Sequence, residues 1–82
     1  MSELDIHIGL ALRYIRTRRR EDPERLANIL SVSLETYAAY ENGLKAIPAA
    51  TLIDLALHFR VSVKYFLDGY AVAEKSKTNR QN

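Results

Sequence analysis

Apolar residues in the first quarter of the chain recur at the spacing of an amphipathic helix. Ile8, Leu12 and Ile15 share one helical face, and Ala11 lies beside them. Such a face is buried when a helix packs against a core. The pattern predicts a helix from about residue 6 to residue 18 or 19.

Two shorter helices are predicted next, each with its own start signal. Asp22 is a good N-cap and Pro23 suits the first helical position. Ser33 can cap a third helix over about residues 34–41, which Asn42-Gly43 would end because glycine tolerates the left-handed conformation. The residues expected to face inward are Leu26, Ala27 and Leu30 in the second helix and Tyr37 and Tyr40 in the third.

The last third of the chain predicts two further helices. Pro48 opens the fourth, and Ile53 and Leu57 widen its apolar face, so we expect it to be the most buried helix. Ser62 can cap a short fifth helix that ends at Asp68-Gly69. The expected inward residues are Leu52, Leu55, Ala56 and Phe59 in the fourth helix and Phe66 and Leu67 in the fifth.

These elements predict one all-α domain. The chain has 82 residues, which we divide into a domain over residues 1–73 and a polar tail over residues 74–82. Five short helices with tight connections favour a five-helix orthogonal bundle held by one shared core. The expected core is Leu12, Leu26, Ala27, Val32, Tyr37, Leu52, Leu55 and Phe66.

The composition narrows the cellular context and the chemistry. Cysteine is absent, which excludes disulfides and thiolate metal sites. No apolar run approaches the ~20 residues that span a bilayer. Residues 1–5 carry two acids and no basic segment, so they do not have the pattern of a signal peptide. We therefore expect a cytoplasmic protein without a membrane partner.

The side chains that could carry catalysis or bind a metal do not form a recognisable set. His7 and His58 lack ligand-like spacing, and His58 is expected to be a partly buried helix residue. The sequence contains no nucleophile, base and acid in a related pattern, and no glycine-rich phosphate loop. We expect no enzymatic activity, no metal and no cofactor.

Positive charge is unevenly distributed, although the net charge is only +2. Arginines gather between Arg13 and Arg20, whereas Lys45 is the one basic residue between Leu34 and Phe59. The cluster is compatible with a polyanionic partner. It is equally compatible with a solvated helix end whose arginines complement the helix dipole.

Residues 23–42 meet the requirements of a helix-turn-helix. Ala27 is small enough for the place where two helices cross, and Ser31-Val32 supplies a compact turn followed by an apolar plug. Tyr37 and Tyr40 supply two anchors three residues apart. Such a unit leaves the start of its second helix free to enter a DNA major groove.

With these features the chain resembles the Cro-like, or xenobiotic-response-element-type, helix-turn-helix regulators. The resemblance implies a phage-repressor-like fold and a sequence-specific DNA-binding regulator of transcription, with double-stranded operator DNA as partner. It also implies an ion pair between Arg16 and Glu41 that ties the first helix to the end of the third. The matching stretches are Ile8–Arg16, Leu26–Ala27, Val32–Ser33, Tyr40–Gly43, Pro48, Leu52–Ala56 and Val61–Leu67.

The resemblance also assigns candidate DNA contacts. Many relatives carry long polar side chains at the groove-facing positions, whereas this chain has short, apolar or acidic ones. Glu35 could accept from a cytosine amino group, and Leu34 could touch a thymine methyl. The positions implied for base contacts are Ser33, Leu34, Glu35, Thr36, Ala38 and Ala39. The candidates for phosphate contacts are Arg18, Arg19, Arg20, Lys45 and Asn42.

Two functional interpretations remain open. In the first, the chain is a stand-alone DNA-binding module that acts as a homodimer, with Val63, Tyr65 and Tyr70 as candidate interface residues. In the second, the same fold is a protein-interaction module of the antitoxin or antiactivator kind. The partner would cover an apolar face formed by Leu34, Ala38, Leu44 and Ile47. The basic stretch before residue 21 favours DNA.

Overall fold

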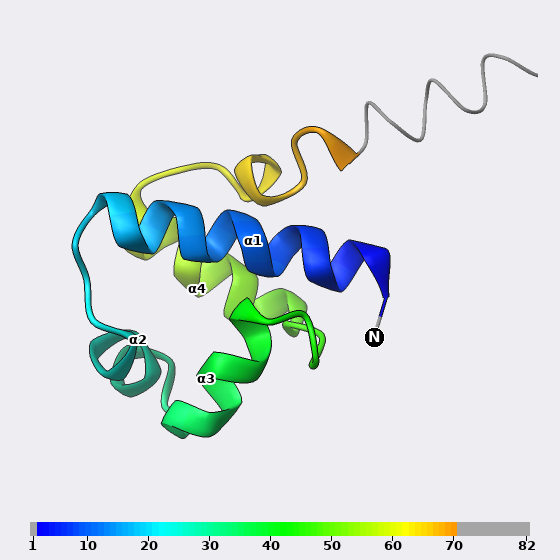
Figure 1. The fold of residues 1–82 in the computed structure, drawn as a ribbon. Helices are drawn as coiled ribbons and strands as arrows, with labels where there is room; N and C mark the ends of the chain where they lie inside the picture. The colour runs from blue at the N-terminus through cyan, green and yellow to red at the C-terminus, as the bar shows by residue number, and fades with distance from the viewer. Residues whose placement is uncertain (1, 71–82) are drawn as a thin grey trace, which may run out of the picture.

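The computed structural model describes residues 2–70, and every regular element in this part of the chain is helical. The elements are α1 (Glu3–Arg18), α2 (Pro23–Leu30), α3 (Leu34–Glu41), α4 (Ala49–Phe59) and the 3₁₀ helix η1 (Val63–Phe66). Figure 1 shows α1 running across the molecule, with α2 and α3 on one side of it and η1 on the other. The predicted all-helical class is confirmed. The predicted tail, residues 74–82, lies outside the described residues.

The helix count differs from the prediction at the C-terminal end. Residues 63–66 form one short 3₁₀ helix in place of a fifth α-helix, and Ser62 makes no side-chain capping hydrogen bond there. A segment of this length cannot close repeated α-helical hydrogen bonds, and 3₁₀ turns are common in such short pieces. Phe66 is nevertheless fully buried, as expected.

The start of α1 also differs from the prediction. The helix begins at Glu3, because the Ser2 hydroxyl accepts a 3.0 Å hydrogen bond from the backbone N–H of Asp5. The apolar periodicity begins later in the chain, so it predicted a start near residue 6. The first turn therefore depends on its cap more than on burial, since Leu4 and Ile6 are both partly solvent-exposed.

The connections between α1, α2 and α3 are short, and residues within them specify where each helix begins and ends. Asp22 is the N-cap of α2, as predicted, but its side chain makes no capping hydrogen bond. Ser31 ends α2 in the left-handed conformation with φ of 58°. Ser33 then caps α3, because its hydroxyl accepts from the backbone N–H of Thr36 at 3.0 Å. This turn fixes the direction in which α3 leaves α2.

The core lies between α1, α2, α3 and α4 and is closed by η1. It contains every residue predicted for it except Val32, which is half-buried at the edge because it lies in the turn between α2 and α3. The fully buried large side chains are Leu12, Leu26, Tyr37, Leu55, Phe59 and Phe66.

The expectation that Ile53 and Leu57 widen the buried face of α4 is wrong. Ile53 is 50% exposed and Leu57 is 71% exposed, so α4 buries only one of its faces. The two residues lie one turn apart, on the side of α4 that no other described element covers. Hydropathy alone could not distinguish this outer stripe from the inner one, because both are apolar.

Gly9 allows α1 to pass close to the end of α3. A Cβ at this position would lie 2.5 Å from the backbone carbonyl oxygens of both Tyr40 and Glu41. Real Cβ atoms do not approach oxygen so closely, and backbone atoms cannot rotate away. The absent side chain thus brings the last turn of α3 against α1, which is where the buried charges of the protein meet.

Candidate nucleic-acid interface

The two helices α2 and α3 form a compact unit whose outer surface is open to solvent. Ala27 is buried at their crossing, and the backbone N–H of Val32 returns to the Ala27 carbonyl at 3.0 Å. Tyr37 and Tyr40 anchor the inner face of α3 in the core. Because these two anchors point inward, the opposite side of α3 faces outward. This is the arrangement that a helix needs to enter a major groove.

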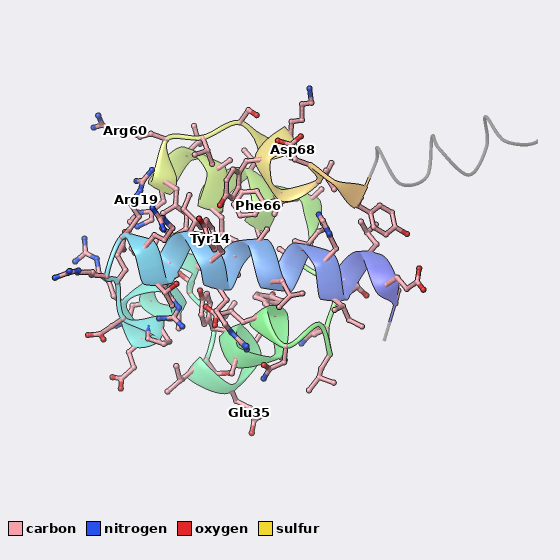
Figure 2. The ribbon with its side chains drawn as sticks, turned by 45° about the horizontal axis from the view of Figure 1, so that its top comes forward. Tyr14, Arg19, Glu35, Arg60, Phe66 and Asp68 are labelled. Atoms are coloured by element: carbon pink, nitrogen blue, oxygen red, sulfur yellow. The ribbon has the colours of Figure 1, made fainter. Side chains whose placement is uncertain are left out.

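The predicted base-contact residues lie on that outer side of α3 or at its start. Ser33, Leu34, Glu35 and Ala38 are exposed, whereas Thr36 and Ala39 are half-buried. The Ser33 hydroxyl donates to Thr36 Oγ1 at 3.0 Å while it caps the helix. It is therefore already engaged, and the Thr36 hydroxyl keeps its own proton as a donor. Figure 2 shows Glu35 projecting from α3 into solvent.

A shallow hollow lies between α2 and the start of α3. Its volume is ≈ 230 Å³, and it is lined by Glu24, Ala27, Asn28, Val32, Ser33 and Leu34. Sequence reasoning did not single out Glu24 or Asn28 as parts of this surface. The signal was available, because residues 24 and 28 lie one turn apart and share a face of α2.

The end of α3 is held by a buried carboxylate. Glu41 is only 6% exposed, and its Oε2 lies 2.6 Å from Arg16 Nε. Arg16 Nη2 also donates to Glu41 Oε1 at 3.2 Å, so the pair is bidentate. Arg16 further donates to the Glu21 carbonyl at 3.1 Å. The pair implied by the family resemblance thus joins α1 to both the end of α3 and the start of the α2 segment.

Two further groups contact Glu41 that sequence reasoning missed. The Tyr37 hydroxyl donates to Glu41 Oε2 at 2.6 Å, and Arg13 Nε donates to Oε1 at 3.3 Å. The sequence pattern indicates only an apolar anchor at Tyr37. Its spacing of four residues from Glu41 on one helix was the available signal. No comparable signal links Arg13 to Glu41, because they meet only in the fold.

These contacts determine the protonation of the cluster. Burial alone would raise the pKa of Glu41, but the hydrogen bonds from Arg16 and Tyr37 outweigh it and hold that pKa below its usual value. Burial raises the pKa of the Tyr37 hydroxyl, and its hydrogen bond to Glu41 raises it further. The hydrogen bond to Glu41 likewise raises the pKa of Arg16. At neutral pH the cluster is a carboxylate held by two guanidinium groups and a neutral phenol.

The predicted phosphate contacts do not lie together. Lys45 is exposed in the segment after α3, and Asn42 is the C-cap of α3 and accepts a hydrogen bond from Arg13 Nη2. Arg18 lies over the Tyr14 ring at 5.3 Å, and Arg19 lies over the Phe59 ring at 5.9 Å.

Figure 2 shows Arg19 and Arg60 both on the other side of α1 from Glu35. The structure therefore does not bring Arg19 next to the outer surface of α3. Arg20 is exposed in the turn after α1, with φ of 56°.

Glu21 makes a second polar junction behind the helix-turn-helix. His58 Nε2 lies 2.7 Å and 3.0 Å from the two Glu21 carboxylate oxygens, and Arg25 Nε lies 3.5 Å from Oε1. These contacts link the turn before α2 to α4. His58 is half-buried, as expected, and within residues 2–70 no group of side chains could hold a metal ion.

The residues predicted for a dimer interface are all half-buried within the monomer. Val63 and Tyr65 pack partly against the core, and the Tyr65 ring meets Phe66 edge-on at 5.3 Å. Tyr70 lies against the His7 ring at 5.6 Å. His7 Nε2 donates in turn to the Asp68 carbonyl at 2.7 Å, so this end of the described chain is tied to α1.

Comparison with known proteins identifies the family. The helix-turn-helix family model matches residues 12–66, which covers α2 and α3 and most of the core. The chain belongs to the helix-turn-helix family. This confirms the resemblance to the Cro-like, xenobiotic-response-element-type regulators. The family is one of transcriptional regulators rather than enzymes. No helix within residues 2–70 is both long enough and apolar enough to cross a membrane.

Individual relatives agree with this assignment. The chain is 36% identical over 63 residues to an uncharacterized transcriptional regulator in the ATPase CF(0) region of Rhodospirillum rubrum. The match covers 77% of this chain and 58% of that relative, so the chain spans little more than half of its length.

Two solved structures share the fold. The clp gene regulator ClgR from C. glutamicum is similar with a TM-score of 0.76 at 25% identity, covering 89% of this chain and 95% of that one. The restriction-modification controller protein C.AhdI from Aeromonas hydrophila gives a TM-score of 0.68 at 20% identity. That match covers 74% of this chain and 92% of that one. At this identity the likeness to C.AhdI concerns the fold alone.

Proposed function

We propose that the protein binds duplex DNA in the cytoplasm with the start of α3 in the major groove, and that it regulates transcription. The observation that carries the proposal is the α2–α3 unit, which anchors one side of α3 in the core and leaves the other side in solvent. The buried Glu41 cluster supports it, because it fixes the far end of the same helix. A helix whose inner side is fixed in the core and whose outer side is exposed can contact base edges with little loss of conformational freedom.

Base recognition in this proposal depends on few polar groups. Glu35 accepts a hydrogen bond from a cytosine amino group, and the Thr36 hydroxyl donates to a base acceptor. Leu34 contacts a thymine methyl, while Ser33 and Ala39 lie close to the groove without long side chains. The acidic and apolar character of this surface favours contacts to particular bases over general attraction to DNA.

The electrostatic contribution is correspondingly small. Lys45 and Asn42 follow α3 directly, and we assign the direct phosphate contacts to them. Arg18, Arg19 and Arg20 lie at the end of α1 and act mainly through their longer-range field, which is screened over about 10 Å at 0.1 M salt. Because few phosphates are contacted, few counterions are released, and the affinity should depend only weakly on salt concentration.

The proposal includes a homodimer, because one recognition helix reads too few base pairs for a specific site. Tyr65 and Tyr70, with Val63, are the interface residues that we propose. All three expose part of their surface after packing against the monomer. Burial raises the pKa of Tyr65, and the positive charges of Arg18 and Arg19 oppose that rise, so two copies meeting there must keep their arginines apart.

The deciding experiment is a binding titration with short duplexes that tile the region upstream of the protein's own gene. Fluorescence anisotropy over a salt series would give both the affinity and its salt dependence. We expect one duplex to bind more tightly than scrambled sequence of equal length, with a shallow salt slope. Absence of binding to any duplex at low salt would overturn the proposal.

A protein partner on the same surface is a second candidate, favoured by the exposure of two leucines. Leu34 is 46% exposed and Leu44 is 64% exposed, with Ala38 exposed and Ile47 half-buried near them in the chain. An antitoxin-like or antiactivator-like role would cover these side chains. Replacing Leu44 with Ser separates the candidates, since Leu44 is outside the proposed base contacts. DNA affinity should be unchanged, whereas a partner held by this face would be lost.

A further inference from the structure

One arginine of α1 bridges the last residue of α3 and its C-cap. Arg13 Nε donates to Glu41 Oε1 at 3.3 Å, and Arg13 Nη2 donates to Asn42 Oδ1. Asn42 closes α3, with its backbone N–H directed to the Ala38 and Tyr40 carbonyls. Arg13 thus contacts two consecutive residues at the end of α3 through different atoms of one planar group.

The chemistry of the guanidinium determines which way the Asn42 amide faces. Arginine has five N–H donors and no acceptor, so only the amide oxygen of Asn42 can face it. The NH₂ group of Asn42 must then face away from Arg13. Asn42 is exposed, and within residues 2–70 no hydrogen bond from its amide nitrogen is present. The end of α3 therefore presents an oriented donor to solvent.

We propose that Arg13 is a positioning residue, which holds the Asn42 amide so that its NH₂ group donates to a phosphate of the DNA backbone. This inference rests on the proposed function and specifies which residue contacts the phosphate and which residue orients it. Asparagine amides are common phosphate ligands, and contacts of this kind fix the register of a protein on its duplex. Asn42 touches the phosphate, and Arg13 acts through Asn42.

The alternative is that Arg13 itself binds the phosphate as a free cation. The structure disfavours this role, because the Arg13 charge is already paired with the buried carboxylate of Glu41. Two of its donor atoms are occupied by Glu41 and Asn42. A neutral donor held in place costs less to align on binding than a side chain that must first leave its partners.

The two roles differ in their salt dependence. A direct ion pair between Arg13 and phosphate would release counterions, so Arg13→Met would make the slope of log K against log salt shallower by about 0.9. A positioning role leaves the slope unchanged while the affinity falls. Arg60→Met is the matched control, because it removes the same charge on the other side of α1 from Glu35 (Figure 2).

The experiment measures duplex binding over a salt series for the full chain and its variants, after circular dichroism has verified folding. We expect Arg13→Met and Asn42→Ala each to weaken binding roughly three- to tenfold, as for one lost hydrogen bond. The double variant should be no weaker than the poorer single variant. Asn42→Asp should bind worse than Asn42→Ala, because it still accepts from Arg13 but turns a negative oxygen toward the phosphate.

The possible outcomes distinguish failure of the positioning role from failure of the proposed function. A shallower slope for Arg13→Met, compared with Arg60→Met, would overturn the positioning role and leave the proposed function intact. Additive losses in the double variant, or Asn42→Asp binding as well as wild type, would also overturn it. Failure of the wild-type protein to bind any duplex would overturn the proposed function and this inference with it.

Discussion

The Tyr37 hydroxyl lies 2.6 Å from Glu41 Oε2, one helical turn further along α3, and both side chains are buried. A tyrosine that anchors α3 in the core therefore also holds the last charged residue of that helix. The aromatic ring contributes apolar burial, and the hydroxyl offsets part of the cost of burying the carboxylate. The orientation of α3 thus depends on one residue in two physical ways.

Tyr37→Phe should reveal the second of these contributions. The substitution keeps the ring and removes a donor to a buried charge, so we expect a loss of about 1.5–3 kcal/mol in the free energy of unfolding. Urea denaturation measures this change. Tyr40→Phe is the matched control, because Tyr40 is also buried on α3 but its hydroxyl is not among the donors to Glu41. Equal losses for the two variants would contradict the assigned role.

The lowered pKa of Glu41 predicts a specific acid sensitivity. The contribution of an acid whose folded pKa is depressed is fully present above its unfolded pKa, which is about 4.3 for glutamate. It is lost as the pH falls from there through the folded pKa. Wild-type protein should therefore be more stable than Glu41→Gln at neutral pH, and the difference should shrink in acid. Unfolding free energies over a pH series measure this, and a difference independent of pH would contradict it.

Arg16 and Glu41 should be energetically coupled. Breaking a buried ion pair typically costs about 3–5 kcal/mol, because one charge loses its partner. Here Glu41 keeps Arg13 and Tyr37 when Arg16 is removed, so we expect Arg16→Met to fall at the lower end of that range. A double-mutant cycle with Glu41→Gln should give a coupling of about 1–3 kcal/mol. Strict additivity of the two losses would exclude a direct interaction in solution.

The crossing of α2 and α3 should tolerate no larger residue. Ala27 is buried where these helices meet, so Ala27→Leu should reduce the free energy of unfolding by roughly 1–3 kcal/mol through overpacking. Ala38→Leu on the exposed side of α3 is the matched control and should change stability little. Thermal denaturation measures both. A fully stable Ala27→Leu variant would mean that the crossing lies elsewhere.

The helix-turn-helix could be predicted from sequence because its requirements are local. Ala27, the turn at Ser31-Val32 and the anchors Tyr37 and Tyr40 all lie within one short segment and meet spacing rules. Apolar stripes were less informative. Ile53 and Leu57 have the same hydropathy as the buried face of α4, and only the packing of the other helices shows that they are outside.

The polar contacts between helices were harder to predict, because they also depend on how segments far apart in the sequence pack together. The Arg16–Glu41 pair followed from a family resemblance, not from spacing, since its partners are 25 residues apart. Arg13 joins the cluster because Gly9 lets α1 approach α3, and no local pattern encodes that approach. The Glu21–His58 contact spans 37 residues and gave no signal in the sequence.

Base preference and backbone affinity should respond to different substitutions on the proposed DNA surface. Lys45→Met should weaken binding to every duplex alike and make the salt slope shallower by about 0.9, because it removes one phosphate contact. Titration of two unrelated duplexes measures this. A loss confined to one duplex would show that Lys45 contacts bases rather than phosphate.

Glu35→Gln should instead change which sequence is preferred. A glutamate accepts from the cytosine amino group, whereas a glutamine amide donates to adenine N7 and accepts from its N6 amino group. The variant should therefore favour adenine at one position where the wild type favours cytosine. Selection from a randomised duplex library, read by sequencing, measures the preference of both proteins. Glu35 is exposed and forms no contact with the core, so the variant should fold normally. An unchanged preference at every position would place base recognition on residues other than Glu35.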